Sequence, residues 1–231
     1  MTSITIEVMD PELRKRFVDS IEYLRKMDFF QDYSNLSSEE ILDKIFNGKM
    51  DYMYHWQEKK GKLGHSRGRT LRESLLEYED SWMKSSDAEI DYRIILFDTK
   101  RTICEDPETV VEEDMGITIL NRLARISRGV FNPTNISYRW FTPSDAILGK
   151  WLVQEVSFDF KGMRHAIEIA LQYDYFVDMG LYELNMLIKD TGYQYCQIDE
   201  REVDDIIVTL LTEEEAEKLK KERGWKFKLI I

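Results

Sequence analysis

Apolar residues recur with a helical period in several segments, most of which begin with an N-terminal signal. In the first segment, Leu13, Phe17 and Ile21 are spaced four residues apart after Asp10-Pro11, and proline is favoured at the first helical position. Other starts carry a capping box, in which a Ser or Thr and a Glu three residues later bond each other's backbone N–H: Ser37/Glu40, Thr70/Glu73, Thr109/Glu112 and Thr212/Glu215. These signals predict helices at about 11–28, 38–47, 70–84, 109–128 and 213–223.

Alternation of apolar and polar residues predicts strands, mostly in the second half of the chain. Val156, Phe158 and Phe160 share one face of the segment 151–160, and Lys161-Gly162 is typical of a two-residue hairpin turn before the segment 163–171. The short β-branched segment 92–97 predicts a strand buried on both faces. Further strands are expected at 136–141, 193–198, 205–211 and 225–231, and a helix at about 175–190 with the stripe Val177, Leu181, Leu184 and Ile188.

The order of these elements predicts the fold class. A mainly helical N-terminal part is followed by a mostly antiparallel sheet with packed helices, which indicates an α+β fold rather than a doubly wound α/β fold. We expect a mainly helical region at 1–90 and an α+β domain at 91–231, and the stretch 58–69 is the best candidate for an exposed loop between them. Whether the helical region is an independent domain stays open.

Composition indicates a globular protein of the cytoplasm. Hydrophobic residues make up 43% of the 231 positions and charged residues 33%, which is an ordinary globular balance. No apolar run approaches the roughly 20 residues of a membrane helix, and the first residues lack the basic start and apolar stretch of a signal peptide. Cys104 and Cys196 have no CxxC spacing, which favours a reducing compartment, although two cysteines leave one disulfide open.

Charge is distributed very unevenly. The net charge is −12, which argues against nucleic-acid binding, and residues 73–115 alone carry 14 acidic and 4 basic groups. Such a concentrated negative field can steer a basic protein partner, with aromatic side chains as anchors. A solvated acidic face is the alternative explanation. The predicted partner-binding residues are Glu77, Tyr78, Asp80, Trp82, Glu105, Asp106 and Glu108.

The sequence carries no motif for a metal, a cofactor or a catalytic residue. His55, His65 and His165 have no metal-site spacing, and neither a G-x-S-x-G elbow nor a phosphate-binding glycine loop is present. Asp98-Thr99-Lys100 after an apolar segment resembles the core of metal-dependent nucleases, but the acidic surroundings suit a polar turn better. An enzyme of another family would need a pocket that gathers distant groups, for instance His165 with Asp159 or Glu155.

The segment from about residue 117 to the end resembles the immunity proteins that accompany bacterial polymorphic toxins. The residues that carry the resemblance are Trp140, Trp151, the segment Val156–Phe160 with its glycine turn, Asp178, Leu184-Asn185, and the run from Leu211-Thr212-Glu213-Glu214-Glu215 to Arg223-Gly224-Trp225. The resemblance is one of layout, over roughly the last 115 residues. It implies a protein that binds and blocks a cognate toxin without catalysis.

We therefore expect a non-catalytic cytoplasmic binding protein of the immunity type, which neutralises a basic protein partner such as a toxin domain. We expect no nucleic-acid or membrane partner and no cofactor. An enzyme of unrecognised family and a structural or regulatory subunit are the alternatives. The oligomeric state and the identity of the partner are left open by the sequence.

Overall fold

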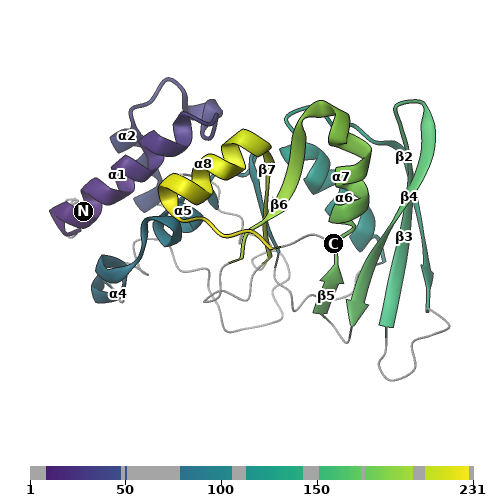
Figure 1. Ribbon diagram of the computed structural model, residues 1–231. Coiled ribbons are helices and arrows are strands. Elements are labelled where there is room, and N and C mark those ends of the chain that lie inside the picture. Colours follow the sequence, from purple (N-terminus) through teal and green to yellow (C-terminus); the bar gives the residue numbers. More distant parts are fainter. Residues whose placement is uncertain are drawn as a thin grey trace, which may run out of the picture. The chain divides into compact units, whose positions relative to one another are not determined.

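The computed structural model describes residues 9–47, 50, 79–105, 113–142, 151–172, 175–199 and 206–228, and its helices and antiparallel sheets confirm the α+β class (Figure 1). The chain divides into two compact units. Unit 1 is Met1–Thr99 with Lys221–Gly224, and unit 2 is Lys100–Lys220 with Trp225–Ile231. None of the helices described is long and apolar enough to cross a membrane.

Unit 1 is built from helices that pack against α1 (Pro11–Arg25). This helix contacts α2 (Ser38–Phe46) and α5 (Asp87–Ile95), while η1 (Gln31–Tyr33) and α4 (Glu79–Lys84) complete the described elements. The expected starts of α1 and α2 are confirmed, because Asp10 Oδ1 accepts from Glu12 N at 2.8 Å and the Ser37/Glu40 capping box is present. The core includes Phe17, Ile41 and Ile94, each fully buried. The capping box Thr70/Glu73 lies outside the described residues.

The strand predicted at 92–97 is wrong, because this segment belongs to helix α5 and the turn after it. Ser86 and Glu89 form a capping box at its start, with Glu89 N bonded to Ser86 Oγ. Ile90 and Ile94 lie one turn apart and are both fully buried, so these β-branched residues form the buried face of a helix. The Ser86-x-x-Glu89 signal is the one that would have identified the helix.

The smaller sheet of unit 2 has the strand order β1-β7-β6. It consists of β1 (Thr102–Glu105), β6 (Tyr193–Gln197) and β7 (Ile206–Thr212), all paired antiparallel. The central strand β7 is buried from Ile206 through Leu211, which is typical of a strand covered on both faces. The sequence patterns predicted β6 and β7 and missed β1, which is only four residues long.

The larger sheet of unit 2 has the order β2-β3-β4-β5. Its strands are β2 (Thr134–Phe141), β3 (Trp151–Phe160), β4 (Met163–Gln172) and β5 (Tyr175–Asp178), again antiparallel. The hairpin turn predicted at Lys161-Gly162 is confirmed, since both residues have positive φ, 49° and 77°, between the paired Phe160 and Met163. Figure 1 shows β2, β3 and β4 as long ribbons and β5 as a short arrow.

The helix predicted at 175–190 is wrong at its start, because 175–178 forms β5 and only Leu181–Ile188 forms helix α7. Gly180 separates the two with φ 67°, and a Cβ at this position would lie 3.0 Å from Ile167 Cδ1. The predicted stripe is confirmed within the helix, where Leu181, Leu184 and Ile188 are buried. The short 3₁₀ helix η4 (Lys189–Thr191) follows α7 directly.

Helix α6 (Met115–Ile126) contacts strands of both sheets. At its start, the side chain of Gln154 accepts from Gly116 N and donates to Glu113 O at 2.7 Å, and any side chain at Gly116 would collide with Gln154 and Val156. The helix predicted at 109–128 is confirmed from Met115 onward, but the prediction is wrong for residues 113 and 114, which form a turn before it, and Thr109/Glu112 lies outside the described residues. Gly116 therefore sets the close approach of helix and sheet.

Helix α8 (Glu213–Arg223) follows β7 without a loop. The capping box predicted at Thr212/Glu215 is confirmed, with Thr212 N bonded to Glu215 Oε2 at 2.8 Å and Glu215 N to Thr212 Oγ1 at 3.1 Å. The closing strand predicted at 225–231 is represented, as far as residue 228, by an isolated bridge between Ile198 and Phe227. Residues 229–231 lie outside the described part of the chain.

Candidate functional site

The predicted acidic contact surface is described only in part. Glu77, Tyr78, Asp106 and Glu108 lie outside the described residues, and Asp80 lies in α4. Trp82 is 6% exposed, and its ring centroid lies 5.6 Å from that of Phe17. The side chain of Glu105 is 13% exposed and forms an ion pair with Arg122. Trp82 and Glu105 are therefore the two members of the set whose side chains are described, each engaged within its own unit, and the acidic docking surface stays a prediction.

Two further acids of the negative segment are bonded within unit 1. Asp91 is fully buried and accepts from Ser20 Oγ at 2.5 Å, from Arg223 Nε at 2.9 Å and from Arg223 Nη2 at 2.7 Å. Asp87 accepts from Arg223 Nη1 at 3.1 Å. Burial acts to lower the pKa of Arg223, but its hydrogen bonds and charge pairing with Asp91 raise that pKa above the ordinary value. Counting acids along the sequence therefore overstates the negative charge that a partner can meet.

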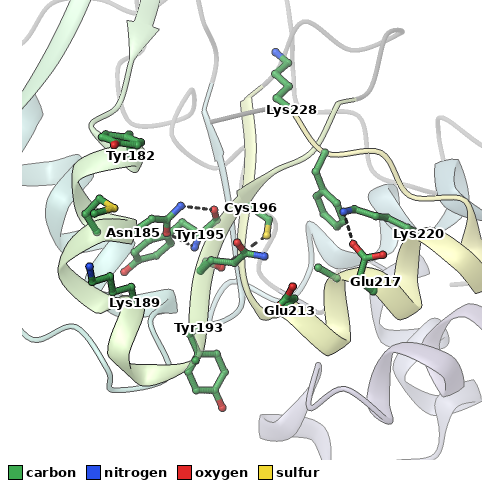
Figure 2. Close-up of a pocket in the computed structure, with 15 residues that line it drawn as sticks. Tyr182, Asn185, Lys189, Tyr193, Tyr195, Cys196, Glu213, Glu217, Lys220 and Lys228 are labelled. Atoms are coloured by element: carbon green, nitrogen blue, oxygen red, sulfur yellow. Dashed lines mark hydrogen bonds and ion pairs between the residues drawn. The ribbon is translucent and has the colours of Figure 1, made fainter. Parts of the chain in front are cut away.

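Unit 2 contains a groove of about 690 Å³ between α7, β6 and the first turns of α8 (Figure 2). We call it the α7–α8 groove. Its lining comes from three chain segments, the third of which includes the residues after α8: Tyr182, Asn185, Met186 and Lys189; Gly192, Tyr193, Gln194, Tyr195 and Cys196; Glu213, Ala216, Glu217, Lys220, Phe227 and Lys228. The volume lies within the range of ligand-binding pockets.

Asn185 on α7 holds the edge of strand β6 that faces away from β7. Its side-chain Oδ1 accepts from Tyr195 N at 2.7 Å, and its Nδ2 donates to Tyr195 O at 3.0 Å. Farther along the strand, Lys228 N donates to Gln197 O at 2.9 Å. Exposed strand edges readily pair with other chains, and here the amide of Asn185 and the C-terminal segment occupy that edge. The groove therefore offers side chains to a ligand at these positions, rather than free strand backbone.

The rim of the α7–α8 groove carries exposed apolar side chains. Tyr182 and Met186 are 47% and 48% exposed and lie one turn apart on α7, opposite the buried stripe of that helix. Across the described residues, Met163 is the other large hydrophobic side chain with comparable exposure, at 61%. Tyrosine and methionine are enriched where proteins contact one another, so their position beside a groove favours a binding role.

Two polar side chains that line the groove, Cys196 and Tyr195, are buried and poorly placed to react. Neither of the described residues Cys104 and Cys196 is in a disulfide, and burial raises the pKa of Cys196 to about 12. At neutral pH the nucleophilic thiolate form is therefore strongly disfavoured. Burial also raises the pKa of Tyr195, and its hydroxyl donates to Leu123 O at 2.9 Å. The disulfide that the sequence left open is therefore not formed between these two residues.

The alternative catalytic group around His165 is not assembled. His165 Nε2 lies 3.2 Å from Phe160 O, and the imidazole packs on the side of the sheet that carries Phe158. Asp159 and Glu155 alternate to the opposite face, where Asp159 is paired with Arg164 and Glu155 with Arg139. Hydrogen bonds, first from Asn135 and then from Arg164, hold the pKa of Asp159 below its ordinary value.

The nuclease-like Asp98-Thr99-Lys100 follows a helix instead of a strand. Asp98 is 7% exposed, and its Oδ2 accepts from Phe30 N at 2.5 Å. Phe30 has the unusual φ of 59°, so this carboxylate stabilises a turn. Within the described ranges, no group of three or more His, Cys, Asp or Glu side chains is arranged to hold a metal ion.

Comparison of the chain with protein-family models, curated proteins and solved structures found no match. The candidate role of the groove therefore depends on its own geometry. Sequence reasoning missed this site, although one signal was present. Tyr182 and Met186 lie off the apolar stripe of α7, so a helical projection places two large apolar side chains on the solvent face.

Proposed function

We propose that the chain is a non-catalytic binding protein that recognises another protein through the α7–α8 groove. The observation that supports this proposal is the exposure of Tyr182 and Met186 at the rim of the groove. Large apolar side chains that remain exposed beside a concavity are the residues that typically contribute most of the binding energy of an interface.

The state of the polar groups also supports binding over catalysis. Asn185 uses both ends of its amide on the backbone of Tyr195, and the thiol of Cys196 is buried with a raised pKa. A general base or a nucleophile needs a group with a pKa near the working pH and in reach of a substrate. The groove instead presents a hydrogen-bonded frame with exposed apolar side chains at its rim, which suits recognition of a partner surface.

Neutralisation of a toxin is the specific form of this function that the resemblance to immunity proteins implies. Blocking an active site requires tight binding and no chemistry, which agrees with a groove framed by α7, β6 and α8. The basic character of the partner stays a prediction from the charge of residues 73–115, because the described acids Glu105, Asp87 and Asp91 are bonded to arginines of the chain itself.

Affinity capture with the full chain tests the proposal. The wild-type chain is compared with the double variant Tyr182→Ala/Met186→Ala and with the control Met163→Ala, which removes an exposed methionine outside the groove. We expect a protein that is retained by the wild type and the control and lost with the double variant. If every captured protein binds the double variant equally well, the groove is not the contact surface.

A growth assay tests the neutralising form. The captured protein is expressed in a host alone, with the wild-type chain, and with the double variant. We expect growth arrest when it is expressed alone, growth with the wild-type chain, and arrest again with the double variant. If the captured protein never arrests growth, the immunity-type role is wrong, although the proposed binding function still stands.

A further inference from the structure

The charged groups around the α7–α8 groove are not balanced. Glu217 is neutralised by Lys220, whose Nζ lies 2.7 Å from Glu217 Oε1. Glu213 stands in the first turn of α8 with Glu214 and Glu215, where the partial positive charge of the helix terminus offsets part of their negative charge. Among the described residues, no ion pair is formed by the ammonium groups of Lys189 or Lys228. Among the described residues that line the groove, three are lysines and two are glutamates, so the lining has a net charge of +1 in a chain with a net charge of −12.

The carboxylate nearest to Lys189 in the sequence also has another lysine as its main partner. The adjacent carboxylate, Asp190, is held by Lys161 on the β3–β4 turn, with Nζ at 2.6 Å and 2.7 Å from its two oxygens. The pKa of Asp190 is lowered first by the hydrogen bond from Lys161 and only last by the charge of Lys189, so Lys161 is its main partner. Figure 2 shows Lys189 beside α7 and Lys228 beside the C-terminal segment, so that they stand on different sides of the groove, with Tyr182 and Asn185 on the α7 wall.

We infer that the α7–α8 groove receives a short acidic segment of a partner protein, in which carboxylates flank an apolar side chain. The apolar side chain contacts Tyr182 and Met186, and the carboxylates contact Lys189 and Lys228. Because Asn185 and Lys228 N already occupy the edge of β6 at Tyr195 and Gln197, the segment is held by side chains and does not extend the sheet there. This inference rests on the proposed function and specifies the chemistry of the partner segment.

Titration of the full chain with two matched peptides tests the inference. One peptide has glutamates on both sides of a central Trp-Leu pair, and the other has lysine in place of each glutamate. The readout is the NMR signal of isotope-labelled methionine methyl groups. Met186 reports on the groove, and Met163, which is 61% exposed and does not line it, is the internal reference.

We expect the acidic peptide to shift the Met186 signal and leave Met163 in place, and to bind more tightly than the lysine peptide. The double variant Lys189→Glu/Lys228→Glu should weaken its binding about tenfold, as the loss of two exposed ion pairs and the added repulsion would do. Lys15→Glu, the same type of substitution at one exposed position of α1, should leave the affinity unchanged.

Equal or tighter binding of the lysine peptide at Met186 would overturn the acidic segment while leaving the groove as a protein-binding site. Absence of a Met186 shift with either peptide would also overturn it, and the capture experiment with Tyr182→Ala/Met186→Ala then decides the proposed function separately. An unchanged affinity in the lysine double variant would show that the two ammonium groups take no part in recognition.

Discussion

In unit 1 the carboxylate of Asp91 is fully buried and bonded to Ser20 and Arg223, whereas in unit 2 Lys189 and Lys228 line a groove with no ion-pair partner among the described residues. Charged side chains thus have two roles in this protein: some stabilise the fold, and others are placed where a ligand can reach them. A buried ion pair is costly to desolvate, and removing one partner leaves an uncompensated charge. Charges at an exposed groove cost little to keep and are available to a ligand. The difference separates residues that hold the fold from residues that can bind.

The largest effect is expected for Asp91→Ala. The change leaves the guanidinium of Arg223, whose side chain is only 13% exposed, without its main partner, and it should lower the free energy of unfolding of unit 1 by about 3–5 kcal/mol. Hydrogen exchange of the amides in α1 and α5 measures the loss. The control Asp19→Ala removes an exposed carboxylate from α1 and should stay within about 0.5 kcal/mol. A loss no larger than that of the control would mean that the buried pair does not stabilise unit 1.

Asn185→Ala is expected to have a smaller effect, within the frame of the groove. It leaves the N–H and C=O of Tyr195 without their side-chain partner, which should cost about 1–3 kcal/mol. Urea unfolding combined with hydrogen exchange in β6 measures this, with the exposed Glu183→Ala on the same helix as control. Unchanged exchange at Tyr195 would show that water replaces the amide fully, so that the edge of β6 is open to pairing.

Glu105→Gln tests an ion pair whose exposure is intermediate between that of the buried Asp91 pair and that of the lysines at the groove. The side chains of Glu105 and Arg122 are 13% and 21% exposed, so their ion pair is partly shielded from water. Loss of the charge should cost about 1 kcal/mol, and the exposed Glu214→Gln on α8 should cost less. Thermal unfolding at low and high salt measures both. If Glu105→Gln is as stable as the wild type, the ion pair with Arg122 does not stabilise the fold, and Glu105 becomes a candidate for partner contact again.

The smallest effect on stability is expected for Tyr182→Ala/Met186→Ala. Both side chains are about half exposed, so the free energy of unfolding should change by less than about 0.5 kcal/mol while partner capture is lost. Leu184→Ala on the buried side of α7 should instead cost about 2–5 kcal/mol. Chemical denaturation of the three proteins gives the comparison. A double variant as unstable as Leu184→Ala would assign the pair to the fold.

Elements whose start or turn is encoded locally were predicted from the sequence. The capping boxes at Ser37/Glu40 and Thr212/Glu215 involve residues three positions apart, and the Lys161-Gly162 turn needs only its own backbone. The segment 92–97 was assigned to a strand because its β-branched residues suit either element, and the deciding cap at Ser86 lies upstream. Residues 175–178 form a strand because β4 is there to pair with them, which no local pattern reveals.

The candidate site was beyond local patterns for the same reason. The sequence determined where charge is concentrated, which helix faces are apolar, and that the chain forms an α+β fold. Tertiary structure decided which charges are paired within the protein and which helices frame the groove. Arg223, for example, bonds Asp91 from 132 positions away. A carboxylate's availability depends on the neighbours that folding supplies, because Coulomb and hydrogen-bond energies act over a few ångströms of space and not along the chain.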